Sequence, residues 1–148
     1  MIFFVLIVAL LTKFRSNDHA YPQRKSEPKK SPELTREISE LLLDLTTRIL
    51  GKKREVTAIA IDFVEHDSWV VGGHLLSEQN RNSFYFDIKI TDETNTKDEK
   101  ARYIREAFAG FERILGNLHE ESYIHIIDAR AGAYGYGGLT QEYRYQHP

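Results

Sequence analysis

The side chains that could do chemistry in this chain are histidine, lysine, arginine and tyrosine, because the sequence contains no cysteine. That absence excludes cysteine nucleophiles, thiolate zinc sites and a disulfide scaffold. His125 lies in an apolar run, where its imidazole could act as an acid or a base near neutral pH, or could be a buried core histidine. Arg81 could bind a carboxylate through two parallel hydrogen bonds, or could be a solvated loop arginine.

Three common kinds of site are not predicted. His66 and His74 are eight residues apart with no third ligand at a suitable spacing, so we expect no metal ion. The glycines at 135–138 follow a predicted strand but open no helix, unlike a dinucleotide-binding loop. Residues 13–30 are basic but poor in aromatic residues, and the whole chain has a net charge of −2. We therefore expect no nucleic-acid partner.

The elements that must position these residues become clear beyond residue 30. A helix begins with Ser31 as its N-cap and Pro32 at its first position, and Gly51 ends it. A β-branched, apolar strand is predicted at 56–64, and a short strand or hairpin arm at 69–73.

The second half of the chain repeats this order. We predict a strand at 84–91, a helix capped by Thr96 and ended by Gly116, a strand at 122–128, and a glycine-rich turn at 134–138. Several positions recur at one offset of 65 residues, which indicates an internal duplication. They are RILG at 48–51 and 113–116, Ile59 and Ile61 with Ile124 and Ile126, and Gly72-Gly73 with Gly137-Gly138.

The duplication predicts an α+β fold. Two β-α-β units, at approximately 19–83 and 84–148, would form a four-stranded sheet with both helices on one face. The other face of the sheet then needs a cover, for which further copies of the chain are the simplest source.

The first unit lacks a clear first strand. The offset places it at 19–26, which has no alternating apolar pattern. We expect residues 1–30 to be an N-terminal extension or linker, first apolar and then basic, that precedes a domain at 31–148. The apolar run 2–11 is too short to span a bilayer. It could be a signal or anchor segment, a strand, or an extension foreign to the domain. We expect membrane contact only if it is a signal or anchor segment.

Residues 31–145 resemble the tautomerase superfamily, which includes 4-oxalocrotonate tautomerase and macrophage migration inhibitory factor. The similarity is greatest to the long, fused-repeat bacterial members. The segments that carry the resemblance are SPEL at 31–34, LGK at 50–52, VTAIAIDFV at 56–64, WVVGG at 69–73, TNTKDEK at 94–100, ESYIHIID at 121–128 and AYGYGGLTQEYRY at 133–145.

This resemblance implies an isomerase that moves a proton next to the carbonyl of a small 2-keto acid or enol, without metal or cofactor. It also implies a homotrimer. The base in these enzymes is the amine of an N-terminal proline. An α-amine titrates near neutrality, and burial and nearby cations lower its pKa further.

The resemblance also suggests roles for individual residues. Lys52 occupies the position of a substrate-facing lysine, although a lysine there could simply complement the helix dipole. Tyr123 and His125 match strand positions that supply a tyrosine and an asparagine to the pocket, so the histidine is a departure. Tyr134 lies in a turn where fused members place polar pocket residues, with turn or interface packing as the alternative. We predict Lys52 and His125 as catalytic, and Tyr123, Arg81 and Tyr134 as substrate-binding.

The N-terminus departs from the family pattern. Ile2 follows Met1, so removal of the methionine exposes no proline. Pro22 would become N-terminal, and catalytic, only if the chain were cut after Tyr21. Alternatively, the encoded start is wrong or rearranged, or the chain is a genuine variant in which residues 2–11 supply the strand and the proline base is absent.

We therefore expect a cofactor-independent tautomerase or related isomerase that acts on a small carbonyl or carboxylate compound. The alternative is a catalytically silent binding or structural protein on the same fold. The repeat and its Gly-Gly hairpins argue against a ferredoxin-like regulatory or RNA-binding module. We expect a cytoplasmic location, or export if residues 2–11 act as a signal.

Overall fold

A computed structural model describes residues 3–10 and 30–148 of the chain. The first unit contains β1 (Phe3–Leu10), α1 (Pro32–Arg48), the 3-10 turns η1 (Arg54–Val56) and η2 (His66–Ser68), β2 (Thr57–Val64), β3 (Val70–Val71), β4 (His74–Leu75) and α2 (Leu76–Gln79). The second contains β5 (Phe84–Thr91), α3 (Lys97–Leu115), β6 (Tyr123–Ala129), the 3-10 turn η3 (Ala131–Ala133), β7 (Gly135–Tyr136), β8 (Leu139–Thr140) and α4 (Gln141–Gln146).

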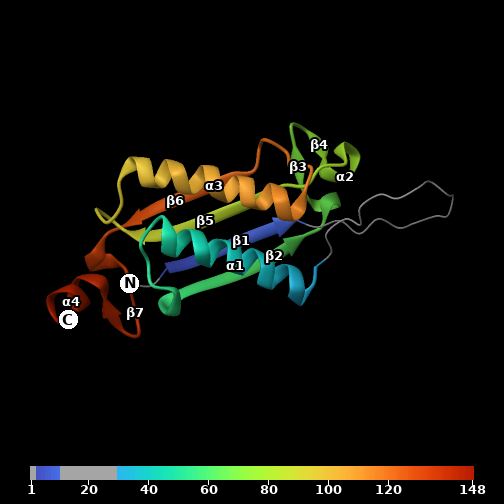
Figure 1. Ribbon diagram of the computed structural model, residues 1–148. Helices are drawn as coiled ribbons and strands as arrows, with labels where there is room; N and C mark the ends of the chain where they lie inside the picture. The colour runs from blue at the N-terminus through green and yellow to red at the C-terminus, as the bar shows by residue number, and fades with distance from the viewer. Residues whose placement is uncertain (1–2, 11–29) are drawn as a thin grey trace.

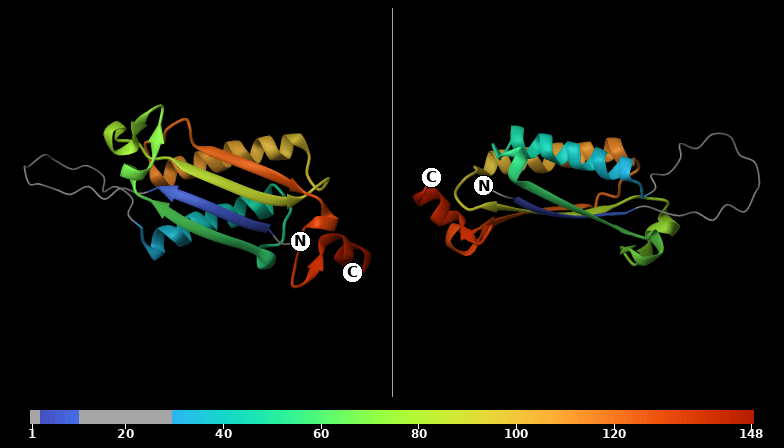
Figure 2. Two further views of the ribbon diagram at one scale, coloured as in Figure 1. Left: turned by 180° about the vertical axis from the view of Figure 1, so that it is seen from behind. Right: turned by 90° about the horizontal axis from the view of Figure 1, so that it is seen from below.

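Four strands form one sheet in the order β2-β1-β5-β6. β1 is parallel to β2 and β5 is parallel to β6, while β1 and β5 are antiparallel where the two units meet. Both long helices cover the same face, and the opposite face is open in the single chain (Figures 1 and 2). This confirms the predicted α+β architecture of two β-α-β units.

The first strand does not lie where the 65-residue offset places it. β1 lies between β2 and β5 and begins 81 residues before β5, so the connection from β1 to α1 is longer than that from β5 to α3. This agrees with the interpretation in which the apolar run 2–11 supplies the strand. The domain boundary at residue 30 stays a prediction, and Pro22 lies outside the described residues.

The helix ends follow the predicted capping residues. The Ser31 hydroxyl accepts a hydrogen bond from the Leu34 amide at 3.1 Å. Thr96 and Glu99 form a capping box, in which each side chain accepts from the backbone amide of the other. Gly116 ends α3 with a φ of 67°.

The core lies between the helices and the sheet. Alternate residues of β5 are buried there, while their neighbours face the open side. The buried side chains that fill this layer include Leu34, Ile38, Leu42 and Leu45 of α1, Phe84, Phe86, Ile88 and Ile90 of β5, and Tyr103, Ala107, Phe111 and Leu115 of α3. Within the described ranges, no helix is both long enough and apolar enough to cross a membrane.

One buried polar contact joins the two helices within this apolar layer. The hydroxyls of Thr46 on α1 and Tyr103 on α3 lie 3.0 Å apart. Burial raises the pKa of Tyr103, so the phenol stays neutral and serves as a hydrogen-bonding group.

We expect Tyr103→Phe to lower the free energy of unfolding by about 1–2 kcal/mol, because it leaves the Thr46 hydroxyl without its partner. Urea denaturation measures this loss. In the double variant with Thr46→Val both polar groups are gone, so the loss should be smaller than the sum of the two single losses. Additive losses would contradict the contact.

Candidate functional site

The candidate residues are distributed between two opposite ends of the sheet. β1 and β2 begin at the end where β5 and β6 finish, because β1 runs antiparallel to β5. We call this the Lys52 end, since Lys52 lies between α1 and β2. The opposite end, where β5 and β6 begin, is the Arg81 end.

A tight turn after α1 brings Lys52 into the interior. Gly51 adopts a φ of 66°, and the amides of Gly51 and Lys52 donate back to the carbonyls of Thr47 and Thr46. Lys52 is 3 % exposed, whereas the next residue, Lys53, is exposed. The two adjacent lysines therefore have very different surroundings.

The Lys52 amine has a defined hydrogen-bond partner. Nζ donates to the Thr94 hydroxyl oxygen at 2.7 Å, and that hydroxyl donates its own proton to the Thr91 carbonyl at 2.5 Å. Thr94 can therefore only accept from Lys52, so one N–H of the amine must point at Thr94 whether the amine is charged or neutral. Sequence reasoning missed Thr94 as a partner, because it lies in the connection of the other unit.

Burial lowers the pKa of Lys52 from 10.5 to about 8. The nearby carboxylates of Glu99 and Asp128 oppose this shift, and the positive charge of Lys100 adds to it. Lys100 is itself paired with Asp128 at 2.6 Å. An amine with this pKa is partly unprotonated at neutral pH, as a proton acceptor must be.

The other predicted catalytic residue lies elsewhere, on the open face of the sheet. His125 is on β6 with its side chain 60 % exposed, so the core-histidine interpretation is wrong. Its Nδ1 is 3.5 Å from Oδ1 of Asp87 on β5. Tyr123 is also exposed on this face, and its ring centroid is 6.4 Å from that of Tyr85.

Asp87 and Tyr85 were not predicted from the sequence. Asp87 is the register partner of His125, and Tyr85 is the register partner of Tyr123. The polar positions in the alternating pattern of β5 are the only signal for them, and that pattern does not tell which residues of β6 lie opposite.

Arg81 is not near Lys52. It lies between α2 and β5, at the Arg81 end, where its side chain donates to the Leu118 carbonyl at 3.1 Å. The structure thus places this predicted carboxylate-binding residue at the end of the sheet opposite to the buried lysine.

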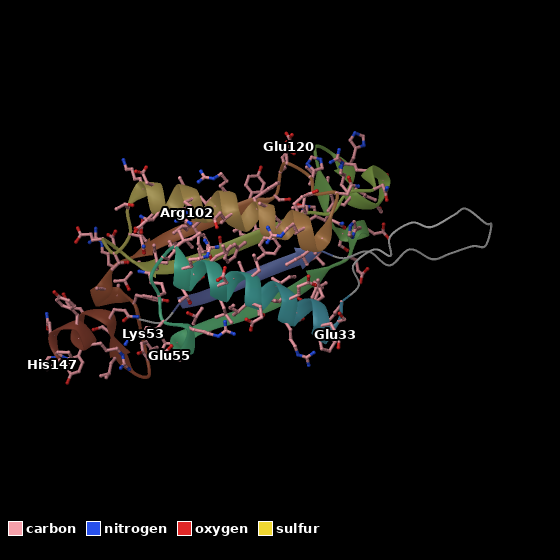
Figure 3. All side chains as sticks on the ribbon, viewed as in Figure 1. Glu33, Lys53, Glu55, Arg102, Glu120 and His147 are labelled. Atoms are coloured by element: carbon pink, nitrogen blue, oxygen red, sulfur yellow. The ribbon has the colours of Figure 1, made fainter. Side chains whose placement is uncertain are left out.

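Tyr134 lies at the Lys52 end, since β6 finishes there and the C-terminal segment follows it. A shallow cavity of about 320 Å³ is formed by residues 132–136 and 138–140, which include Tyr134. Arg144 of α4 stacks on Tyr136, with its guanidinium 3.8 Å from the ring centroid, and donates to the Tyr136 carbonyl. Figure 3 shows Lys53 at the same end of the molecule as His147.

Within one chain, then, the structure brings Tyr123 and His125 together on the open face but does not join them to the other predicted site residues. Lys52 meets Thr94, His125 meets Asp87, and Arg81 lies apart from both. His125 is four residues before the last residue of β6, which at about 3.3 Å per residue is roughly 13 Å from that strand end. In the part of the chain that the structure describes, no group of three or more histidine or acidic residues could hold a metal ion.

Comparison with known proteins shows similarity in structure but not in sequence. No family model matches the chain, and no curated protein matches it in sequence. The structure is similar to Pt0534 inactivated by 2-oxo-3-pentynoate, with a TM-score of 0.71 and 14% identity over 94% of this chain and 96% of that chain.

Two other similar structures are of related kinds. A fused 4-OT described as a symmetric trimer matches with a TM-score of 0.71 and 12% identity, over 95% of this chain and 98% of that one. A macrophage migration inhibitory factor-like protein from Entamoeba histolytica matches with a TM-score of 0.66 and 15% identity, over 93% and 97%. The chain therefore has the fold of the tautomerase superfamily, which confirms the resemblance at the level of structure.

We expect Lys52→Met to be more stable than the natural chain at pH 7. A lysine whose pKa is about 8 when folded and 10.5 when unfolded destabilises the fold by about 3 kcal/mol below pH 8, and this penalty disappears as the pH rises to the unfolded value. Loss of the bond to Thr94 offsets about 1 kcal/mol.

Urea denaturation at pH 7 and pH 10 measures the effect. The advantage of Lys52→Met should shrink or reverse at pH 10, and Lys53→Met serves as the exposed control with little change at either pH. If Lys52→Met is less stable than the natural protein at pH 7, Lys52 stabilises the fold through its contacts and the expected penalty of burying its charge is wrong.

Proposed function

We propose that this protein is a cofactor-independent tautomerase or related isomerase that moves a proton next to the carbonyl of a small 2-keto acid or enol. The observation that carries the proposal is the buried amine of Lys52, with a pKa of about 8, at the end of a tautomerase-like sheet where β1 begins. In this proposal Lys52 supplies the amine base that other members of the superfamily place on an N-terminal proline.

The proposed proton transfer uses the amine twice. In the enol-to-keto direction, neutral Nζ accepts the hydroxyl proton of the enol, and the resulting ammonium stabilises the negative charge on the enolate oxygen. The same proton is then returned to another atom of the conjugated system, which regenerates the neutral amine. Thr94 keeps one N–H engaged throughout. Since Lys52 is 3 % exposed, the proposal requires a local opening of the residues that cover Nζ, with the bond to Thr94 kept.

The proposed substrate class is supported by the chemistry of one similar protein. Pt0534 is inactivated by 2-oxo-3-pentynoate, a small 2-keto acid with a carbon–carbon triple bond conjugated to its carbonyl. An unprotonated amine adds to such a triple bond. The same compound is therefore a suitable probe for an unprotonated amine at Lys52.

We further propose that the protein is a homotrimer. Two similar structures are described as trimers of fused 4-OT, and the open face of this sheet carries exposed aromatic side chains. Because Lys52 is buried at one end of the sheet and His125 is exposed on its open face, we propose that a site that used both would draw on residues from two copies. Copies packed against the open face would supply that arrangement.

The main alternative is a catalytically silent binding or structural protein on the same fold. The observation in its favour is the bond from Lys52 to Thr94, which links the two units and could serve stability alone. Activity and stability measurements on the same variants separate the two functions.

We expect Lys52→Ala to lower kcat/KM for ketonisation of phenylpyruvate or 2-hydroxymuconate by at least about tenfold, because the base is lost. The control Lys53→Ala should retain full activity, since that neighbouring lysine is exposed. In the natural protein kcat/KM should rise with pH and level off above about pH 8, as the amine loses its proton. If the natural protein ketonises neither substrate faster than buffer, the proposed activity is wrong.

The proposed trimer predicts a native mass of three times 17.2 kDa, measured by light scattering. Ile127→Glu, which places a charge on the open face of β6, should dissociate it. Ile104→Glu on α3 is the matched control, since Ile104 is exposed on the helical side. A natural protein that remains monomeric at micromolar concentration would exclude the trimer.

A further inference from the structure

Four side chains form a cluster on the open face of the sheet, where β5 and β6 lie next to each other. Tyr85 and Asp87 project from β5, and their register partners Tyr123 and His125 project from β6. An acid and an imidazole thus lie directly opposite, with a pair of phenol rings beside them. We call these four residues the open-face cluster.

The carboxylate in this cluster lacks a hydrogen bond on one side. Oδ1 of Asp87 is buried and accepts no hydrogen bond from the described residues. The imidazole Nδ1 of His125 lies 3.5 Å from it, so a small rotation of either side chain brings the two into a hydrogen bond. Leaving a buried carboxylate oxygen unpaired is costly, which favours that rotation whenever Nδ1 carries a proton.

The second neighbour of Asp87 is the phenol of Tyr85, on the same strand. The negative charge of Asp87 is the largest cause that raises the pKa of Tyr85, with burial and a hydrogen bond to Asp87 adding to it. The Tyr85 phenol therefore stays protonated and serves as a donor. Asp87 lies between a neutral phenol on its own strand and an imidazole on the next.

Other charged side chains on this face are less well placed. Lys89 is exposed two residues further along β5, and Asp62 is exposed on β2, at the far edge of the sheet. Neither forms an ion pair among the described residues, whereas Oδ1 of Asp87 lies 3.5 Å from Nδ1 of His125. Asp87 is thus the group that can orient the imidazole.

We propose that Asp87 is a positioning residue that holds His125 with its proton on Nδ1, so that Nε2 presents its lone pair away from the sheet. In this tautomer Nε2 can accept a hydrogen bond, or the proton itself, from the substrate hydroxyl and give it back, so His125 assists the proton transfer that Lys52 carries out. Without the carboxylate, either ring nitrogen could carry the proton. The inference rests on the proposed function only for the role of His125 in turnover, and not for its tautomer.

The tautomer is measured directly from the ring nitrogen chemical shifts of the full-length protein containing isotope-labelled histidine. His125→Gln identifies the His125 signals among the six histidines. We expect neutral His125 to carry its proton on Nδ1 in the natural protein. In Asp87→Asn the amide can donate to Nδ1, so the proton should shift to Nε2 in most molecules. Asp62→Asn, which removes a carboxylate from the same face, should leave the signals unchanged.

An activity measurement completes the test. Asp87→Asn should lower kcat at least about tenfold with little change in KM, and Asp87→Glu should recover part of the loss, because a carboxylate is restored. A proton on Nε2 in the natural protein, or no change of tautomer in Asp87→Asn, overturns the inference even if Lys52 proves essential. Conversely, if no activity is found but the tautomer depends on Asp87, the pair stands and the proposed function fails.

Discussion

The pairing of β1 with two neighbours is the interaction on which the rest of the structure depends. β1 is hydrogen-bonded to β2 along its whole length and to β5 in the opposite direction, so among the described strands it is the one that connects the two units in the sheet. Without β1, β2 would have no hydrogen-bonding partner in the sheet, and α1 would pack over a gap between β2 and β5. An unbroken apolar run suits a strand that has neighbours on both sides. The antiparallel junction also fixes which strand ends meet, and therefore places Lys52 beside Thr94.

The energetics of Lys52 show how a fold can carry an unfavourable group. Moving an ammonium out of water costs free energy, and burial accordingly lowers the pKa of the amine. Glu99 and Asp128 lie near enough to moderate that cost, while Thr94 supplies a neutral acceptor. The pKa of Lys52 therefore reflects a balance between burial, which lowers it, and the two carboxylates, which raise it.

Much of the fold could be predicted from the sequence, because the two halves repeat the same local signals. Ser31 and Thr96 begin the helices as expected, and β5 has the predicted bounds. The first strand was harder to place, since a constant offset assumes connections of equal length. The site was less predictable still. Arg81 and Lys52 lie at opposite ends of the sheet because of the direction in which the strands run. Asp87 faces His125 because of the register between β5 and β6. Strand direction and register both depend on how segments pair, so neither can be predicted from one segment alone.

The unequal connections of the two units have a consequence for how such a protein can change over time. Five residues join β5 to α3, whereas twenty-one join β1 to α1. Loop-closure entropy grows only with the logarithm of length, so the longer connection costs only about 1.3 kcal/mol more. Strand pairing and burial across a central position outweigh that amount. The first strand of such a sheet can therefore be exchanged for an unrelated apolar segment while the helices, and the lysine behind the first of them, keep their places.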